Sequence, residues 1–283
     1  MEEPPAGSKL GFDDVVIRPR VSSVRSTAEI EIEAETVFGG GGRDARRLTC
    51  VPLALMPSIA PGQVITNVLP AIAGMRSLIV VRGGPAAEAA AHGVEEGTID
   101  PGLLIVASEA GDGVVGMIDG AMARLKARCI LVEDKSGSTI TLIDACKAVR
   151  DRYPNHILIA GEIQTSDALE AVARETDADA VMLAPPWSSA PVGVPAFAMT
   201  TECARAGRAS GMKVMANVEK AADVPKALAA GADFVALPAG ADSAAGIVRD
   251  AARALLDVCM RTDSRTIKDL SSKASFQACR KLA

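Results

Sequence analysis

Four carboxylate residues stand just after apolar runs of the sequence, where a loop would leave a buried strand. They are Glu133, Asp134, Glu162 and Glu219. Carboxylates that lie close together raise one another's pKa, and such groups can act as general acid and general base or hold a divalent cation. The alternative is that each one caps the following helix or pairs with Lys135 or Lys220, since carboxylates are common at helix N-termini. We predict that the four carboxylates are catalytic.

Several other residues in similar positions could bind a ligand, and we predict this role for six of them. They are Arg82, Trp187, Ser188, Ser189, Asn217 and Gly240. Trp187 is the only tryptophan, and its ring could stack on a planar ligand, close one end of the fold or form an oligomer contact. His92 and His156 are the only histidines. Neither is a candidate base, because His92 is expected to end a helix and His156 to start a strand, at the end of the fold opposite the carboxylates. No dedicated metal-binding residue is predicted.

Eight apolar runs without polar alternation must position these residues. They are Val51–Met56, Leu78–Val81, Leu103–Val106, Ile130–Val132, Ile157–Ala160, Ala180–Leu183, Val214–Ala216 and Phe234–Leu237. Such runs are typical of strands buried on both faces, and the segments between them have helical spacing. Eight strands alternating with helices predict an α/β fold, a (β/α)8 TIM barrel. An open doubly wound sheet is the alternative, but no G-x-G-x-x-G turn follows the first run.

The clearest strand–helix–strand unit is Lys213–Pro238. Asp223 is expected to cap its helix, Pro225 stands in the first turn, and Gly231 ends the helix. In a closed barrel the eighth strand pairs with the first.

Glu133 and Glu162 would end neighbouring strands at the carboxyl ends, where TIM barrels carry their chemistry. Their carboxylates are then expected to come within the ~4–6 Å at which each raises the other's pKa.

Three segments are predicted along the chain. Residues 1–49 form an N-terminal extension, residues 50–260 the barrel, and residues 261–283 a basic tail that is either a surface helix or a loose end. Within the extension, residues 1–9 are expected to be disordered, residues 29–33 alternate Glu and Ile as in an exposed strand, and residues 39–42 are four glycines of a flexible turn.

Composition excludes some function classes. The 283 residues carry a net charge of −5, which argues against a nucleic-acid partner. No apolar run approaches the ~20 residues that span a bilayer, and the N-terminus has no signal-peptide pattern. Six scattered cysteines without a C-x-x-C pair indicate reduced thiols, so we predict a cytoplasmic protein with no membrane partner.

Four segments together resemble a known family. Leu10–Arg20, Gly193–Pro195, Ile159–Thr165 and Asp223–Val235 are similar to segments of IMP dehydrogenases and GMP reductases. No CBS pair interrupts the barrel, and in this the chain is more similar to the reductases. The resemblance implies a TIM barrel, a homo-oligomer that is usually a tetramer, and binding of a purine mononucleotide and a nicotinamide cofactor.

The chain departs from the family pattern at the site itself. The family's nucleophilic cysteine lies on the loop after the sixth strand, and the matching Pro185–Val192 has no cysteine. Met215–Asn217 and Pro238-Ala239 replace glycine-rich segments that hold ribose and phosphate. Glu133 stands where the family has a cofactor-binding Asp, and Glu162 where it has an Asn. We therefore expect the family's thiol-dependent reaction to be lost.

Three hypotheses about function follow. The first is a divergent enzyme that uses an acidic barrel mouth on a small molecule, either related to purine nucleotides or of another kind. The second is a non-catalytic paralogue that binds a ligand or assembles with an active partner. The third is a GMP reductase-like oxidoreductase. The residues do not determine the substrate or the cofactor, and a nicotinamide is implied by the resemblance alone.

Overall fold

The computed structural model describes residues 10–39, 45–58, 76–135, 139–185, 194–240 and 244–279. The predictions for residues 1–9, for Trp187, Ser188 and Ser189, and for most of the glycine turn at 39–42 lie outside these residues.

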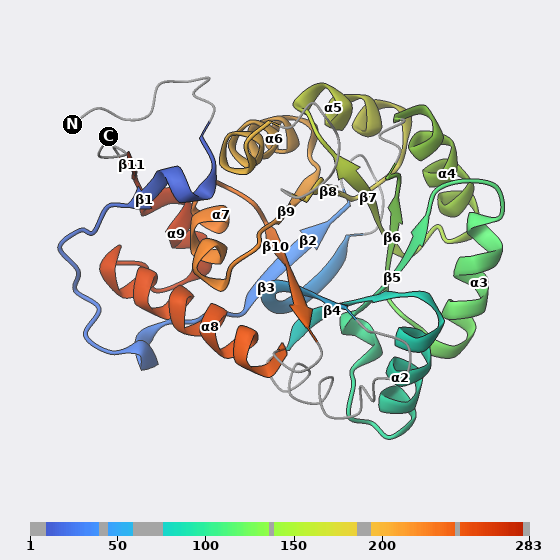
Figure 1. Cartoon of the computed structure of the whole chain (residues 1–283), viewed down its shortest axis with the longest axis horizontal. Helices are drawn as coiled ribbons and strands as arrows, with labels where there is room; N and C mark the ends of the chain where they lie inside the picture. Colours follow the sequence, from blue (N-terminus) through green and yellow to red (C-terminus); the bar gives the residue numbers. More distant parts are fainter. Residues whose placement is uncertain are drawn as a thin grey trace.

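Eight parallel strands form a closed barrel (Figure 1). They are β3 (Arg46–Ser58), β4 (Ser77–Arg82), β5 (Leu104–Glu109), β6 (Cys129–Glu133), β7 (Ile157–Ile163), β8 (Ala180–Leu183), β9 (Lys213–Asn217) and β10 (Phe234–Gly240). Each pairs with the next in chain order, and β10 closes on β3 with Val235 opposite Leu53 and Leu237 opposite Leu55. The predicted TIM barrel and its closure between the first and last strands are both confirmed.

Helices alternate with the strands and form the outer layer in Figure 1. They are α2 (Gly83–Glu95), α3 (Val114–Leu125), α4 (Thr139–Arg152), α5 (Ser166–Glu175), α6 (Ala196–Ser210), α7 (Val224–Ala229) and α8 (Ala244–Arg261). The buried side chains of the strands and helices form two apolar clusters. On β4, Leu78 and Val80 belong to one cluster, while Ile79 and Val81 belong to the other, which also holds the helix side chains. Both faces of each strand are thus buried, which explains the apolar runs without polar alternation.

The predicted start of α7 is correct, but the capping interaction is not the one expected. Asp223 occupies the N-cap position and Pro225 stands in the first turn. The Asp223 carboxylate makes no capping bond to a backbone N–H and instead accepts a hydrogen bond from Lys226 Nζ at 3.0 Å. Gly231 follows the helix with φ +106°, a conformation that glycine adopts readily.

The N-terminal extension differs from the expectation in one element. No strand covers residues 29–33. Glu29 belongs to a 3-10 turn, η2 (Thr27–Glu29), which the Ser26 side chain caps, and Glu31 forms only an isolated bridge with Thr266. β2 (Ala34–Phe38) begins after them. β2 pairs antiparallel with the first part of β3. A second short 3-10 turn, η1 (Phe12–Asp14), leads into β1 (Val15–Ile17).

The segment after Met260 is not a loose end within residues 261–279. It contains α9 (Ile267–Lys273), whose Leu270 is fully buried, and β11 (Phe276–Ala278), which pairs antiparallel with β1. Of the two alternatives, the helix is therefore the one found. The described residues also include the 3-10 turns η4 (Pro101–Leu103) and η5 (Ala221–Asp223).

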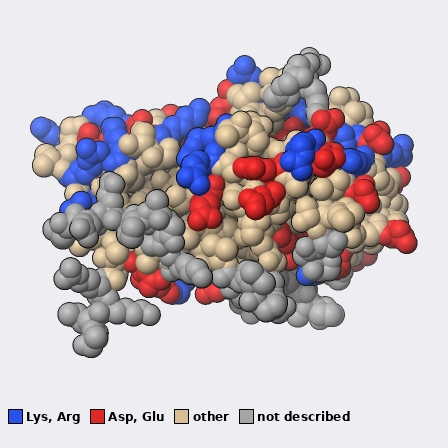
Figure 2. Space-filling model, turned by 90° about the horizontal axis from the view of Figure 1, so that it is seen from above, with Lys and Arg blue, Asp and Glu red and all other residues tan. Residues whose placement is uncertain are grey.

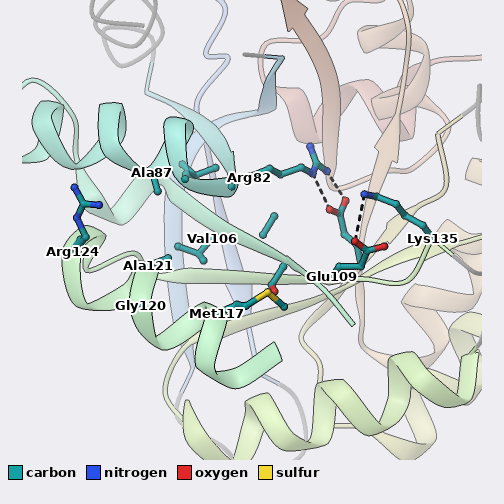
Figure 3. Close-up of a pocket in the computed structure, with 15 residues that line it drawn as sticks. Arg82, Ala87, Val106, Glu109, Met117, Gly120, Ala121, Arg124 and Lys135 are labelled. Carbon is teal, nitrogen blue, oxygen red and sulfur yellow. Dashed lines mark hydrogen bonds and ion pairs between the residues drawn. The ribbon is translucent and has the colours of Figure 1, made fainter. Parts of the chain in front are cut away.

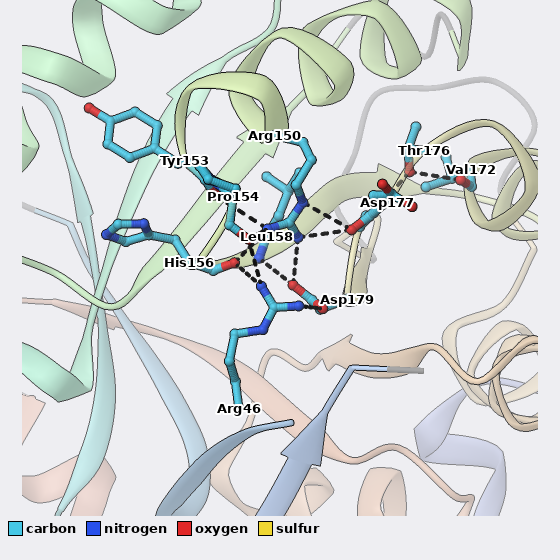
Figure 4. A network of polar contacts seen from close by, with 11 residues as sticks. Arg46, Arg150, Tyr153, Pro154, His156, Leu158, Val172, Thr176, Asp177 and Asp179 are labelled. Carbon is cyan, nitrogen blue, oxygen red and sulfur yellow. Dashed lines mark hydrogen bonds and ion pairs between the residues drawn. The ribbon is translucent and has the colours of Figure 1, made fainter. Parts of the chain in front are cut away.

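A buried ionic network lies at the amino-terminal end of the barrel (Figure 4). Asp179, just before β8, accepts hydrogen bonds from Arg46 Nη2 at 2.5 Å, from Arg150 Nη2 at 2.7 Å and from the Leu158 amide at 2.9 Å. Both arginines also donate to the His156 carbonyl oxygen. The network therefore joins the β2–β3 hairpin to α4 and to two strands, and His156 lies at the far end of the barrel as predicted.

The surface and the helices give two further observations. Figure 2 shows acidic and basic side chains interspersed over one face of the molecule. Among the helices that the structure describes, none combines the length and the apolar character needed to cross a membrane.

All six cysteines are unpaired, and only Cys279 is exposed. Burial raises the pKa of Cys50, Cys129, Cys146 and Cys203 to about 12 and the pKa of Cys259 to about 11. We expect a thiol reagent to find six thiols in denatured, unreduced protein but to react rapidly with only Cys279 in the native protein, because the thiolate is the reactive form. A denatured count below six would contradict the prediction of free thiols.

Candidate active site

An arginine and a glutamate from two different strands bind each other at the carboxyl ends of the barrel. Arg82 ends β4 and Glu133 ends β6. Arg82 donates from Nε to Glu133 Oε2 at 2.8 Å and from Nη2 to Glu133 Oε1 at 2.5 Å. The side chain of Glu133 is only 5% exposed, whereas that of Arg82 is 37% exposed. This two-point pairing offsets the charge of the buried carboxylate and fixes its orientation.

Glu162 occupies an unusual backbone conformation on the neighbouring strand. The pairing of β7 with β8 shifts register between Gly161 and Ile163, so Glu162 sits at a bulge with φ +60°. Positive φ is uncommon for residues other than glycine, and bulges re-aim side chains next to functional sites. Glu162 is half-buried here.

The surroundings of Glu162 favour its protonated form. Burial raises the pKa of the Glu162 carboxyl, and the negative charge of Glu133 raises it further. Lys135 and Arg82 oppose this effect, while Asp134 adds to it. The direction agrees with the expected coupling of Glu133 and Glu162, although burial is the larger cause. A carboxyl group whose pKa is moved toward neutrality is suited to proton transfer.

Gly161 makes room for this arrangement. A Cβ at Gly161 would lie 2.9 Å from Glu133 Cγ and 3.2 Å from the Val132 carbonyl oxygen. The first distance is shorter than real Cβ atoms show, and the second is tighter than most Cβ contacts. A side chain at residue 161 would therefore require Glu133 or the neighbouring backbone to shift.

A cavity of about 530 Å³ opens beside the Arg82–Glu133 pair (Figure 3). Its polar side is formed at the ends of β4 to β6 and includes Lys135, whose Nζ lies 3.8 Å from Glu109 Oε2. Small and apolar residues of α2 and α3 form the other side, and Arg124 lies across the cavity from Arg82 and Lys135 in Figure 3. The volume falls in the range of small-molecule sites.

A smaller cavity of about 180 Å³ adjoins Glu162. Asp134, Gln164 and Thr165 line it with Glu162, and Asp134 is buried. The structure thus brings three of the four predicted carboxylates, Glu133, Asp134 and Glu162, to one region of the barrel mouth.

Glu219 does not join them. It is exposed and lines a separate cavity of about 420 Å³ with Asp13 and Lys220. Lys220, considered as a partner for the predicted carboxylates, binds Asp13 through Nζ at 2.9 Å instead.

Two of the predicted ligand-binding residues, Asn217 and Gly240, line neither of the two cavities near Glu133 and Glu162. Asn217 ends β9, is 3% exposed, and donates from Nδ2 to the Leu183 carbonyl oxygen at 2.5 Å. Its Oδ1 has no hydrogen-bond partner among the described residues. Gly240 ends β10 opposite Ser58.

Sequence reasoning did not select Glu109 and Arg124, which both line the larger cavity. Glu109 ends β5, so its position after an apolar run was a usable signal. Arg124 lies within α3, and only the packing of α3 against α2 brings it to the cavity. In the part of the chain that is described, no three His, Cys, Asp or Glu side chains are grouped so that they could hold a metal ion.

Comparison with known proteins identifies the family. The model of the IMP dehydrogenase / GMP reductase domain matches residues 111–255, more than half of the chain. The chain belongs to this family.

Individual members of the IMP dehydrogenase / GMP reductase family are similar along most of the chain. The GMP reductases of Onchocerca volvulus and Caenorhabditis elegans are 26% and 25% identical, each over 95% of this chain and 78% of the relative. The GMP reductase of Serratia proteamaculans is 26% identical over 95% of this chain and 81% of its own length. The resemblance seen in the sequence is thus confirmed at the level of the family.

Proposed function

We propose that this chain is a divergent enzyme of the family that transfers a proton to or from a small molecule at the barrel mouth, with Glu162 as the general acid or base. The observation that carries the proposal is the Glu162 carboxyl itself. It lies half-buried beside a cavity, its pKa is raised, and its backbone is held at φ +60°. Strained backbone and a displaced pKa are features that cluster at active sites.

Glu162 does not line the larger cavity, but Glu133, whose charge acts on Glu162, does. The charges of the larger cavity suit a ligand with an anionic or polar end. Lys135, Arg124 and the exposed part of Arg82 line the larger cavity, which also has an apolar side on α2 and α3. Because the similar proteins are GMP reductases, purine nucleotides and related molecules are the first class to test.

The cysteines support a reaction without a covalent thiol adduct. Residues 185–193 contain no cysteine. The five buried cysteines have pKa values of about 11 or 12, so almost none of these thiols is ionised at neutral pH. Cys279 lies beyond β11, where its amide donates to the Asp14 carbonyl oxygen. The nucleophile that the family resemblance implies therefore has no counterpart among these cysteines.

The residues present do not fit the implied nicotinamide cofactor. By the resemblance, Glu133 takes the position of the cofactor-binding Asp. Both of its carboxylate oxygens already accept hydrogen bonds from Arg82, and its side chain is 5% exposed. The proposed reaction is therefore a proton transfer and includes no hydride step.

One observation favours the second candidate, a non-catalytic paralogue that binds a ligand. Arg82 and Glu133 satisfy each other, so this pair could be structural rather than reactive. In that case Glu162 would contribute to ligand binding but not to a chemical step.

The proposal is tested by two assays on the full chain. A cofactor absorbance assay with IMP and NAD, and with GMP and NADPH, is expected to show no turnover above a blank without protein. A thermal-shift screen of purine nucleotides and nucleosides is expected to find a ligand that raises the melting temperature, since a ligand that binds only the folded state stabilises it.

Two lysines provide the matched variants. Lys135→Gln is expected to reduce the thermal shift, whereas Lys220→Gln should leave it unchanged because Lys220 lines a different cavity. Turnover in the cofactor assay would support the GMP reductase-like alternative and contradict the proposal. An equal loss of the shift in both variants would contradict the assignment of the ligand to the larger cavity.

A further inference from the structure

A cavity of about 360 Å³ lies at the end of the barrel opposite the mouth. Lys213, the first residue of β9, and Asp233, which directly precedes β10, both line it. The ends of α6 and α7, part of β2 and one face of α9 complete the lining. None of the residues of the candidate active site contributes to it.

Positive side chains outnumber negative ones in the lining of this cavity. It holds three cationic side chains, Arg208, Lys213 and Lys268, and one carboxylate, Asp233. Lys213 Nζ lies 3.2 Å from Asp233 Oδ1, so these two charges offset each other. Within the described residues, neither the Arg208 guanidinium nor the Lys268 ammonium group makes a hydrogen bond or an ion pair. Arg208 and Lys268 are both exposed, so two solvent-facing positive charges line the same cavity without a carboxylate partner among the described residues.

The Arg208 guanidinium lies close to the backbone of Gly231. A Cβ at Gly231, which has φ +106°, would lie 2.7 Å from Arg208 Nη1 and 3.5 Å from Arg208 Cζ. The end of the exposed Arg208 side chain thus lies beside the turn after α7, which places the guanidinium at the edge of the cavity. Leu228 and Ile267, both buried, provide an apolar wall next to the charged groups.

We propose that this cavity binds the dianion of a phosphate monoester. Arg208 would hold the phosphate oxygens through its planar fork, and Lys268 would add a second positive charge. The apolar wall of Leu228 and Ile267 would contact the organic part of the ester. The volume lies at the lower end of the range for ligand cavities, which fits a small ester.

A different role for Arg208 must be separated from this one. Arg208 lies in the last turn of α6, where a cation stabilises the helix dipole without any ligand. That role gives no specific response to phosphate, so phosphate binding distinguishes the two.

The experiment is calorimetric titration of the full chain with inorganic phosphate, with sodium chloride of equal ionic strength as the reference. Specific binding is expected in the wild type. Arg208→Gln and Lys268→Gln should each weaken it about tenfold or more, because each removes a charge-assisted contact. Arg205→Gln is the matched control, since Arg205 is exposed on the same helix and does not line the cavity.

Two further arms complete the test. Glycerol 3-phosphate is expected to bind more tightly than inorganic phosphate, because the ester adds contacts with the apolar wall. Lys135→Gln, which alters the barrel mouth, should leave unchanged the phosphate binding that Arg208→Gln and Lys268→Gln weaken. A failure of this proposal is therefore distinct from a failure of the proposed function. Heat equal to that of the chloride reference, or equal affinity in the wild type and in Arg208→Gln, would overturn the proposal.

Discussion

Replacing Glu162 with glutamine is expected to remove the proposed proton-transfer reaction and to stabilise the folded chain at neutral pH. The amide keeps the size of the side chain but can neither gain nor lose a proton. Loss of a general acid or base lowers the rate of a reaction by about 10²- to 10⁴-fold. The measurement is kcat and its pH profile for a ligand that is converted at the mouth.

The stability change follows from the raised pKa of Glu162, which burial causes first and the Glu133 charge second. In the folded chain the carboxyl keeps its proton to a higher pH than in the unfolded chain, where the pKa has its ordinary value of 4.5. The wild type therefore loses stability as the pH rises from 4.5 through the folded pKa. Glu162→Gln does not lose this stability. Its free energy of unfolding should therefore exceed that of the wild type above the folded pKa of Glu162, and the difference should vanish below pH 4.5.

Glu219→Gln is the matched control, because Glu219 is an exposed glutamate shortly after β9 and lines a different cavity. It should change neither kcat nor the pH dependence of stability. If Glu162→Gln leaves kcat unaltered, Glu162 is not the proton-transferring group. If the difference in free energy of unfolding is the same at every pH between 3 and 8, the stability effect does not come from ionisation of Glu162.

The fold could be predicted because its signals are local. Each strand is a short run buried on both faces, so β4 shows four successive apolar residues at Leu78–Val81. The alternation of strands and helices then predicts a parallel sheet, and eight such units favour a closed barrel over an open sheet. The position of Glu133 after such a run was sufficient to place it at the mouth.

The details of the site could not be predicted, because they depend on contacts distant in sequence. Arg82 and Glu133 are 51 positions apart, and only the barrel geometry brings the guanidinium onto the carboxylate. The bulge at Glu162 depends on the register of β7 against β8, which periodicity does not reveal. The prediction that Glu133 and Glu162 are neighbouring carboxylates was therefore incomplete. It did not include the ion pair between Arg82 and Glu133, which offsets the charge of Glu133.

The same reason explains why the network around Asp179 was missed. Arg46 lies in the N-terminal extension, and Arg150 lies in a helix. Because arginine is usually exposed, the sequence around each position predicts a surface residue. In the structure the side chain of Asp179 is 3% exposed, that of Arg150 9% and that of Arg46 11%. One buried carboxylate thus serves two buried guanidinium groups and a backbone amide, which no local pattern indicates.

Asp179→Ala is expected to lower the free energy of unfolding by about 3–5 kcal/mol, the range for removing one partner of a buried ion pair. The variant leaves both arginines without their carboxylate and removes the acceptor of the Leu158 amide (Figure 4). Urea denaturation of the full chain at neutral pH measures the change. Asp179→Asn keeps an acceptor for the amide but removes the charge, so its loss should be smaller.

Glu35→Ala provides the control for this prediction. Glu35 also pairs with an arginine of the same hairpin, Arg47, at 2.8 Å, but their side chains are 44% and 64% exposed. Exposed pairs contribute at most about 1 kcal/mol, because water competes for both charges. If Asp179→Ala and Glu35→Ala cost the same, the buried network does not anchor the hairpin. A large loss for Asp179→Ala alone would indicate that burial at the amino-terminal end, and not the number of ion pairs, determines how firmly the extension is held to the barrel.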